Sequence, residues 1–505
     1  MKMVKSAFLA SAAGLVAMSG AQAADLPVKA KPVEYVKVCS LYGAGFYYIP
    51  GTDICMKIGG YVRFQETAAS SSSVTSGPFA STGSLWNREA STDYQHRVRA
   101  IATFDTRQQT AYGTLRTYLL MGFTNDSIDG NTNSLYSTRA FIQLAGFTFG
   151  KATSFFDFVS TAAVAYNAGH TYSPDTGDSG HIVAAYTAQF GNGLSATISA
   201  EQARRRGIDY LDVAAPVAGI TSTGAATSPL TAFGALAADQ GGNGIIQDIV
   251  GNIRVDQAWG SAQVSAALHN ANASYYGSGT TASTLVEWNG HPDDKWGFAV
   301  SGGLRLNAPM IGPGDYFQAA IVYAEGATRY ASNTPTSTTV SDGQTVAISI
   351  HNDGGFTGTQ AAPGIYELTT AWSVFASFEH FWTPSLRTSV YGSYLNLSRP
   401  DNLNDAMCAS GLYNLASAGN SRATGCDLDS VQWNIGTRTQ WNITKDLYVG
   451  LDVIYHKLET GTFNSAGTAR LVNTTAPGKG TSSTYLTGDV DAWAATWRIH
   501  RDIVP

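Results

Sequence analysis

Five arginines lie where they could form one basic, water-facing surface. Each belongs to a segment in which apolar and polar residues alternate, and each occupies a polar position: Arg63, Arg97, Arg99, Arg116 and Arg139. Successive side chains of a β-strand point to opposite faces, so this phase directs the guanidinium groups away from the apolar face. Such a wall is expected to guide polar and charged solutes electrostatically.

The four cysteines form two pairs that are local in sequence, Cys39 with Cys55 and Cys408 with Cys426. Four cysteines allow three pairings, and an exported chain can form disulfides. The local pairing is favoured because the two pairs lie far apart and each would close one short loop that contains turn formers. Free thiols are the alternative. Neither pair has a CxxC spacing or nearby histidines, so no metal site is expected.

No pattern of catalytic residues stands out in the sequence. The nine histidines show no HxxxH or HExxH spacing, and there is neither a GxSxG elbow nor a GxxxxGK[ST] phosphate loop. His456 and His500 fall on the inward phase of the last strands, which leaves a hydrolase site inside a barrel as an alternative. We expect a protein that is not an enzyme and that has no cofactor.

The composition favours a β-rich fold. Of the 505 residues only 13% are charged, against roughly a quarter in ordinary soluble proteins. After the N-terminus no apolar run approaches the roughly 20 residues of a membrane-spanning helix. Glycine, tyrosine and phenylalanine are abundant, with 53, 25 and 21 residues. These features disfavour both a disordered chain and a helical membrane protein.

Residues 1–23 have the pattern of a secretory signal peptide. Lys2 and Lys5 precede an apolar run over residues 7–17, and Ala21-Gln22-Ala23 supplies a cleavage site of small residues. A buried N-terminal helix is the alternative. The order of the three features favours export, with a mature chain that starts at Ala24.

Sixteen segments show period-two alternation, and the connections between them alternate in length. The expected strands are residues 56–65, 94–106, 111–123, 136–144, 147–153, 181–190, 194–205, 248–259, 261–276, 295–309, 315–331, 365–383, 386–398, 430–443, 447–459 and 489–502. Seven short turns and eight long, polar loops join them, as an up-and-down barrel requires when both chain ends lie at the short turns. A secreted β-sandwich is the alternative, but it does not require strictly alternating connections.

The expected fold is therefore all-β, a 16-stranded antiparallel transmembrane β-barrel. Sixteen strands leave room for an aqueous channel, whereas small barrels fill their interiors with side chains. An arginine facing lipid would cost about 2–4 kcal/mol at mid-bilayer, so the five arginines are expected to point inward.

Three sequence motifs resemble those of the alphaproteobacterial outer-membrane porins. They are residues 38–63 (VCSLYGAGFYYIPGTDICMKIGGYVR), residues 139–157 with Arg-Ala-Phe-Ile-Gln and Ser-Phe-Phe-Asp, and the late hairpin around residues 436–455. The resemblance implies a general diffusion porin, a homotrimer that passes ions and small hydrophilic solutes passively. It also implies an N-terminal periplasmic-side segment with a disulfide hairpin at residues 24–54, followed by the barrel at residues 55–505.

Porins of this kind fold their third long loop into the channel, here residues 154–180. The resemblance then predicts a constriction in which Asp157, Asp175 and Asp178 of this loop face the five arginines of the wall. Opposed charges across a narrow passage create a transverse field that favours polar over apolar solutes. The expected partners are outer-membrane lipids, lipopolysaccharide and the barrel assembly machinery, with no nucleic acid. An adhesin that displays the long loops is a further alternative.

Overall fold

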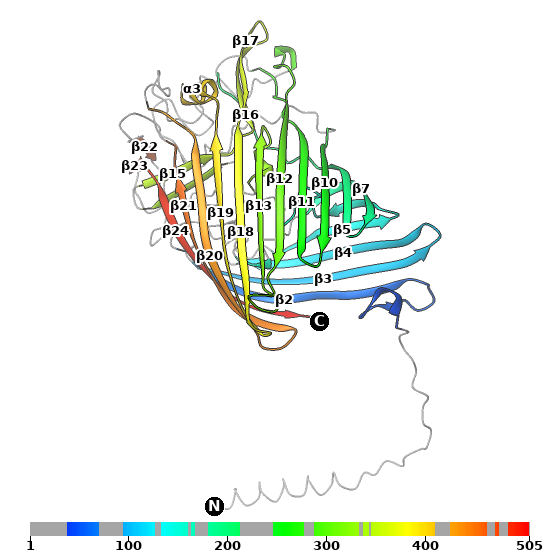
Figure 1. Cartoon of the computed structure of the whole chain (residues 1–505). Coiled ribbons are helices and arrows are strands. Elements are labelled where there is room, and N and C mark those ends of the chain that lie inside the picture. Colours follow the sequence, from blue (N-terminus) through cyan, green and yellow to red (C-terminus); the bar gives the residue numbers. More distant parts are fainter. Residues whose placement is uncertain are drawn as a thin grey trace, which may run out of the picture.

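The computed structural model describes residues 38–69, 94–126, 133–159, 163–166, 180–212, 246–276, 287–332, 337–342, 345–409, 425–461, 470–473 and 483–503. Sixteen strands in this part of the chain form one closed antiparallel barrel (Figure 1). In order around the wall they are β2 (Cys55–Ala69), β3 (Tyr94–Thr110), β4 (Gly113–Asp126), β5 (Asn133–Leu144), β6 (Phe147–Ala152), β7 (His181–Gly191), β8 (Leu194–Glu201), β10 (Asp248–Gln257), β11 (Gly260–Asn270), β12 (Trp296–Asn307), β13 (Tyr316–Glu325), β18 (Thr370–Thr383), β19 (Leu386–Ser398), β20 (Ser430–Asn442), β21 (Leu447–Glu459) and β24 (Val490–Asp502).

The first and last strands close the barrel. β2 pairs antiparallel with β24, from Tyr61 opposite Asp502 to Ala69 opposite Ala494. Closure leaves no free sheet edge, so every strand of the wall finds backbone partners on both sides. The predicted fold class, a 16-stranded antiparallel barrel, is confirmed.

The two faces of the wall differ in the way that the period-two pattern predicts. Large apolar side chains lie exposed on the outer face, among them Ile253, Val264 and Leu451, which are 61%, 67% and 48% exposed. The alternate residues point inward and include Asn252, Gln263 and Asp452. A barrel with an apolar outside and a polar inside is suited to lipid around a water-filled interior.

Some strands end earlier than the sequence pattern predicts, and β8 shows why. Its alternation continues to residue 205, but the strand stops at Glu201. Beyond it, the backbone N–H of Arg204 donates to the Asp248 carboxylate at 3.0 Å, and that of Arg206 donates to Asp353 at 2.8 Å. Because carboxylates from other elements accept these bonds, the segment leaves the sheet.

The short turns lie at the end of the barrel that also holds the C-terminus, opposite the long loops (Figure 1). In the turn between β7 and β8, Asn192 and Gly193 have φ values of 49° and 73°. A Cβ on Gly193 would lie 1.9 Å from the carbonyl oxygen of Asp256, so this position accepts only glycine. The turn thus packs against the neighbouring hairpin.

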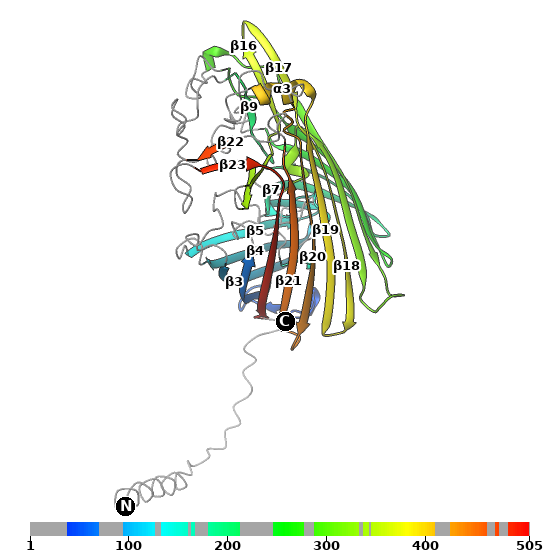
Figure 2. The same ribbon diagram turned by 90° about the vertical axis from the view of Figure 1, so that its left-hand side faces the viewer.

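The long loops contain structure of their own, which the sequence did not predict. β9 (Ile208–Tyr210), β16 (Gly354–Thr359) and β17 (Ala362–Leu368) form one small sheet. β14 (Ser337–Asp342), β15 (Thr345–Ile350), β23 (Ser483–Thr487) and β22 (Arg470–Asn473) form another. Figure 2 shows the β16–β17 hairpin and α3 (Asp401–Ala409) at the long-loop end of the barrel.

Both predicted disulfides are formed, Cys39–Cys55 and Cys408–Cys426. The first closes a hairpin in which β1 (Tyr47–Tyr48) pairs with the start of β2. The second ties α3 to the segment that leads into β20. Among the described helices, none combines the length and the apolar character needed to cross a bilayer. The expected signal peptide, residues 1–23, lies outside the described residues.

Candidate functional site: the inner wall and the loops that cover it

Four of the predicted arginines lie on the inner face of β2, β3 and β5. Arg63 is directly opposite Arg99 in the β2–β3 pairing, and Arg97 follows on the same face. Arg139 of β5 pairs with Leu120 of β4, and Leu120 pairs with Thr103 of β3. Arg139 therefore lies at the level of Thr103, four residues along β3 from Arg99. The four side chains are half-buried, so solvent reaches them.

Aromatic rings contact two of these guanidinium groups, and a hydroxyl group accepts from one of them. Arg63 lies over the ring of Tyr61 at 5.4 Å, and Arg99 over that of Tyr136 at 5.9 Å. The Arg99 Nε–H also donates to the Thr124 hydroxyl at 3.1 Å. Stacking of a planar guanidinium on a ring is favourable and restricts its orientation.

Arg116 belongs to a second level of the wall, near the short turns. It lies opposite Arg107, and both donate to the carboxylate of Asp105 at distances between 2.9 and 3.2 Å. Along β4, the residue that pairs with Arg97 in the sheet is Asp126. Arg116 is ten residues from Asp126, so it lies roughly 33 Å of strand from the level of Arg97. The predicted wall is thus spread along the barrel rather than gathered at one height.

The first part of the third long loop lies against the inner faces of β8, β10 and β11. The backbone N–H of Phe155 donates to Glu201, and Asn252 donates to the Phe155 carbonyl at 2.6 Å. Asp157 forms an ion pair with Arg204 at 2.7 Å, in which the two side chains are 2% and 4% exposed. Asp157 is therefore buried beside the root of the loop and has its cationic partner there.

Residues 163–166 of the same loop reach the opposite side of the barrel. The Tyr166 N–H donates to Asp452 at 2.5 Å, and its hydroxyl donates to Gln440 at 3.1 Å. Arg498 of β24 lies over the Tyr166 ring at 4.0 Å. The described parts of the loop thus contact inward-facing side chains from β8 to β24. Asp175 and Asp178 lie outside the described residues, so the complete course of the loop stays a prediction.

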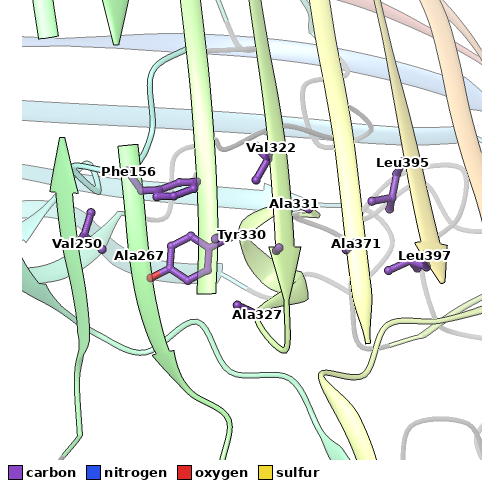
Figure 3. Packing of buried hydrophobic residues seen from close by; sticks show 12 residues of the cluster. Phe156, Val250, Ala267, Val322, Ala327, Tyr330, Ala331, Ala371, Leu395 and Leu397 are labelled. Atoms are coloured by element: carbon purple, nitrogen blue, oxygen red, sulfur yellow. The ribbon is translucent and has the colours of Figure 1, made fainter. Parts of the chain in front are cut away.

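A small apolar cluster anchors this loop to the wall (Figure 3). Phe156 of the loop packs against Tyr330, with ring centroids 4.6 Å apart, in a cluster that also contains the strand residues Val250 and Ala267. Both rings are fully buried. Burial of a side chain as large as that of Phe156 contributes about 1.5–3 kcal/mol.

The sixth long loop also covers the inner wall. Ala347 of β15 packs with Leu458 and Ala492, inward-facing residues of β21 and β24. Next to it, Ser349 shares a hydrogen bond of 2.7 Å with Ser430 of β20. Sequence reasoning placed no inward segment here, because a hairpin rich in Thr, Ser and Val has the composition of an exposed loop as well.

His351, at the end of this segment, is completely buried. Its Nε2 lies 3.0 Å from the Ser349 hydroxyl and 2.9 Å from Gln432. Burial, together with the nearby Arg206 and Arg399 charges, holds the pKa of His351 well below its ordinary value. The ring is therefore neutral at physiological pH and acts as a structural hydrogen-bonding group.

The inward side chains differ in exposure around the barrel. From β13 to β24 many inward side chains have almost no exposure, for example Phe375, Ser389, Asp452 and His456 at 0%. On β2 to β5 the inward arginines are partly exposed, although their inward neighbours Gln65, Ile101 and Thr124 are buried. Toward the short turns the wall opens again into a polar cavity of about 960 Å³, whose lining includes Arg254, Asp256 and Arg305.

The alternative of a hydrolase site receives no geometric support. His456 of β21 pairs with Ala492 of β24. Ala492 is eight residues from His500 on the same strand, so the two histidines are separated by roughly 26 Å of strand. The two histidines therefore cannot act on one substrate bond. Among the described residues, no three His, Cys, Asp or Glu side chains come together as a metal site would require.

Comparison with known proteins agrees with the barrel. The Porin subfamily matches residues 25–489. The chain belongs to the porin subfamily. Porin Omp2b of Brucella suis is 33% identical over 269 residues, which are 51% of this chain and 64% of that protein. Porin Omp2a of Brucella ovis is 36% identical over 236 residues, 39% of this chain and 59% of that protein.

The chain thus spans little more than half the length of the curated porins it matches. Among solved structures, the outer membrane channel DcaP of Acinetobacter baumannii aligns with a TM-score of 0.51 at 12% identity. The alignment covers 90% of this chain and 99% of that one, and at this identity it shows a shared fold only. Family and fold together place this porin in the outer membrane.

The structure also identifies wall residues that the sequence analysis did not include among the site residues. Arg107 continues the two-residue phase of Arg97 and Arg99 but lies just beyond the predicted end of its strand, at residue 106. Lys57 lies opposite Asp105 on the same face. Extending the alternation by one residue would have found Arg107, whereas no sequence signal identifies Tyr166 or Arg204 as loop anchors.

Proposed function

We propose that this porin forms a passive, water-filled channel for ions and small hydrophilic solutes. The observation that carries the proposal is the set of partly exposed arginines on the inner face of β2–β5, inside a barrel of sixteen strands. A barrel of this size leaves an aqueous passage. Family membership favours a channel over an enzyme, because the matched relatives are porins.

The passage runs between the basic wall and the third long loop. Arg63, Arg97, Arg99 and Arg139 form one side of the constriction, and Asp175 and Asp178 are the loop carboxylates proposed to face them. Asp157 has a different part in this arrangement, because its ion pair with Arg204 fixes the loop root. Arg116 acts at the short-turn mouth instead.

The proposed assembly is a homotrimer surrounded by outer-membrane lipid and lipopolysaccharide and inserted by the barrel assembly machinery. Support comes from the exposed apolar outer face, which must contact lipid or a neighbouring subunit. Purified protein in mild detergent should migrate as a heat-modifiable trimer. Monomeric behaviour at all protein concentrations would contradict this assembly.

The channel itself is tested in planar bilayers and by liposome swelling. Purified protein should produce stepwise conductance increments and should admit small sugars into liposomes, with entry slowing as sugar size increases. Heat-denatured protein serves as the control. A folded, inserted barrel that gives neither conductance nor swelling would refute the proposed function.

The constriction is tested by the double substitution Arg97→Gln and Arg99→Gln. In a narrow pore, fixed charges set the local ion concentrations, so the reversal potential in a salt gradient should move toward cations. The shift should shrink between 0.1 M and 1 M salt, as the screening length falls from about 10 Å to about 3 Å. An unchanged reversal potential at 0.1 M salt would place the basic wall elsewhere.

A further inference from the structure

We propose that three of the long loops open and close as one unit, and that this unit is a two-state gate on the passage. The loops are the third, between β6 and β7, the fourth, between β8 and β10, and the sixth, between β13 and β18. All three contribute side chains to one buried cluster of charged and aromatic groups. The coupling of the loops stands on these contacts, and only its consequence for conductance rests on the proposed channel function.

Tyr330 of the sixth loop is the residue at which the loops meet. Its buried ring packs against Phe156 of the third loop, with centroids 4.6 Å apart (Figure 3). The guanidinium of Arg204, in the fourth loop, lies 4.4 Å from the same ring. The Tyr330 hydroxyl donates to Asp248, the first residue of β10, at 2.7 Å. One side chain thus contacts two other loops and the barrel wall.

His269, near the end of β11, joins two carboxylates from different parts of this cluster. Its Nδ1 donates to Asp248 at 2.7 Å, and its Nε2 lies 3.7 Å from Asp353 of the sixth loop. All three side chains are 0% exposed. Asp353 also accepts the backbone N–H of Arg206, in the fourth loop, at 2.8 Å. The imidazole therefore links the carboxylate that holds Tyr330 to a carboxylate on which the fourth and sixth loops meet.

Arg204 connects the third loop to the same cluster by a second route. Its side chain donates to Asp157 of the third loop at 2.7 Å, and its backbone N–H donates to Asp248 at 3.0 Å. Both side chains of the Asp157–Arg204 pair are almost completely buried. The third loop is thus held by the fourth loop, and the fourth loop by the wall.

Opening of one loop alone is unfavourable because it would leave charges of the cluster buried without their partners. If the third loop moved away, Arg204 would lose its hydrogen-bonded carboxylate while Tyr330 still covered it, and such a loss is costly. If the sixth loop opened as well, water would reach the cluster and would solvate its charges. Packed clusters have discrete arrangements and do not deform gradually. The closed state and the fully open state are therefore favoured over half-open ones.

The test is thiol labelling at two buried positions, with Val159→Cys in the third loop and Ala347→Cys in the sixth. Asp157→Ala perturbs the third loop directly. Both thiols should then react with a water-soluble maleimide at least about 10-fold faster, because one opening event exposes both. Coupling is reciprocal, so Ser349→Ala, which removes the 2.7 Å bond to Ser430 in the sixth loop, should also accelerate labelling of the thiol in the third.

Tyr330→Phe tests the cluster itself, because it removes the hydroxyl bonded to Asp248 and keeps the ring. Both thiols should react at least about 5-fold faster in this variant. The matched control is Tyr316→Phe, which also removes a hydroxyl from a buried carboxylate, that of Glu379, at 2.8 Å but outside the cluster. It should change the labelling of the Ala347→Cys thiol less than about 2-fold, since distant sites act independently.

Heat-modifiability reports whether each variant folds, and Asp157→Asn, which keeps the shape of the side chain, replaces Asp157→Ala if that barrel does not form. Faster labelling of the Val159→Cys thiol alone would show that the loops open independently and would overturn the inference. Unchanged labelling of both thiols would overturn it as well.

Single-channel recording tests the gate. Asp157→Ala should raise the occupancy of one larger conductance level at least about 10-fold, because the loops uncover the inner wall in one step. A graded series of levels would contradict a two-state gate. If the unmodified protein gives no conductance, the proposed channel is refuted, and the labelling rates still decide whether the loops are coupled.

Discussion

The buried ion pair between Asp157 and Arg204 offers a direct test of how the third long loop is held. The two side chains are 2% and 4% exposed, and their charged atoms are 2.7 Å apart. Removing one partner of such a pair leaves an uncompensated buried charge and costs about 3–5 kcal/mol. Arg204 would keep its contact with the Tyr330 ring at 4.4 Å, so Asp157→Ala should fall near the lower end, about 3 kcal/mol.

The loss of about 3 kcal/mol should favour local opening of the loop root and should not unfold the barrel. At 1.4 kcal/mol per factor of ten, 3 kcal/mol raises the open population roughly 150-fold. Val159 is 5% exposed, so a Val159→Cys substitution would place a protected thiol beside the anchor. The four native cysteines are in disulfides and give no background in labelling with a water-soluble maleimide.

The matched control is Asp256→Ala, which breaks a pair of the same residue types on the same wall. In that pair Arg254 and Asp256 are 35% and 53% exposed at 2.8 Å. Exposed pairs contribute at most about 1 kcal/mol, which corresponds to roughly a 5-fold change in labelling. Both substitutions are combined with Val159→Cys, and the labelling rate of that thiol is compared. If the thiol reacts no faster with Asp157→Ala than with Asp256→Ala while both barrels stay folded, the ion pair does not anchor the loop.

Three further outcomes are expected. Gly193→Ala should prevent or slow barrel folding, because a Cβ there would lie 1.9 Å from a carbonyl oxygen. The control Gly251→Ala should fold normally, because a Cβ there would have no atom nearer than 3.7 Å. Heat-modifiability of the barrel measures both outcomes. Removing the hairpin disulfide by Cys39→Ser and Cys55→Ser should increase protease sensitivity of the hairpin, since a closed loop of this length contributes about 3 kcal/mol; equal digestion rates would contradict this. The pKa of His351 is depressed in the folded loop, so the stability that the neutral ring contributes is present above about pH 6.5 and is lost as the pH falls. Hydrogen exchange in the sixth loop should therefore accelerate below that pH. His351→Gln should remove this pH dependence of hydrogen exchange.

The wall of the barrel was predictable from the sequence because strand periodicity is a local property. Every second residue of β3 or β20 points inward whatever the rest of the chain does, so the phase of Arg97 and Arg99 could be assigned without coordinates. The alternation of short and long connections then gave strand number and closure. The local cysteine pairing was favoured by spacing, since each pair would close one short loop, and both disulfides are formed.

What the loops do inside the barrel depended on contacts between residues far apart in the chain. Tyr166 contacts Asp452 across 286 positions, and Asp157 meets Arg204 across 47, and no periodic pattern encodes either contact. These contacts bury one side of the lumen and leave the arginines of β2–β5 accessible. The sequence by itself determined which residues face the interior. Only the tertiary structure decided which of them meet water, because that depends on where a long, aperiodic loop finds partners for its backbone and its buried charges.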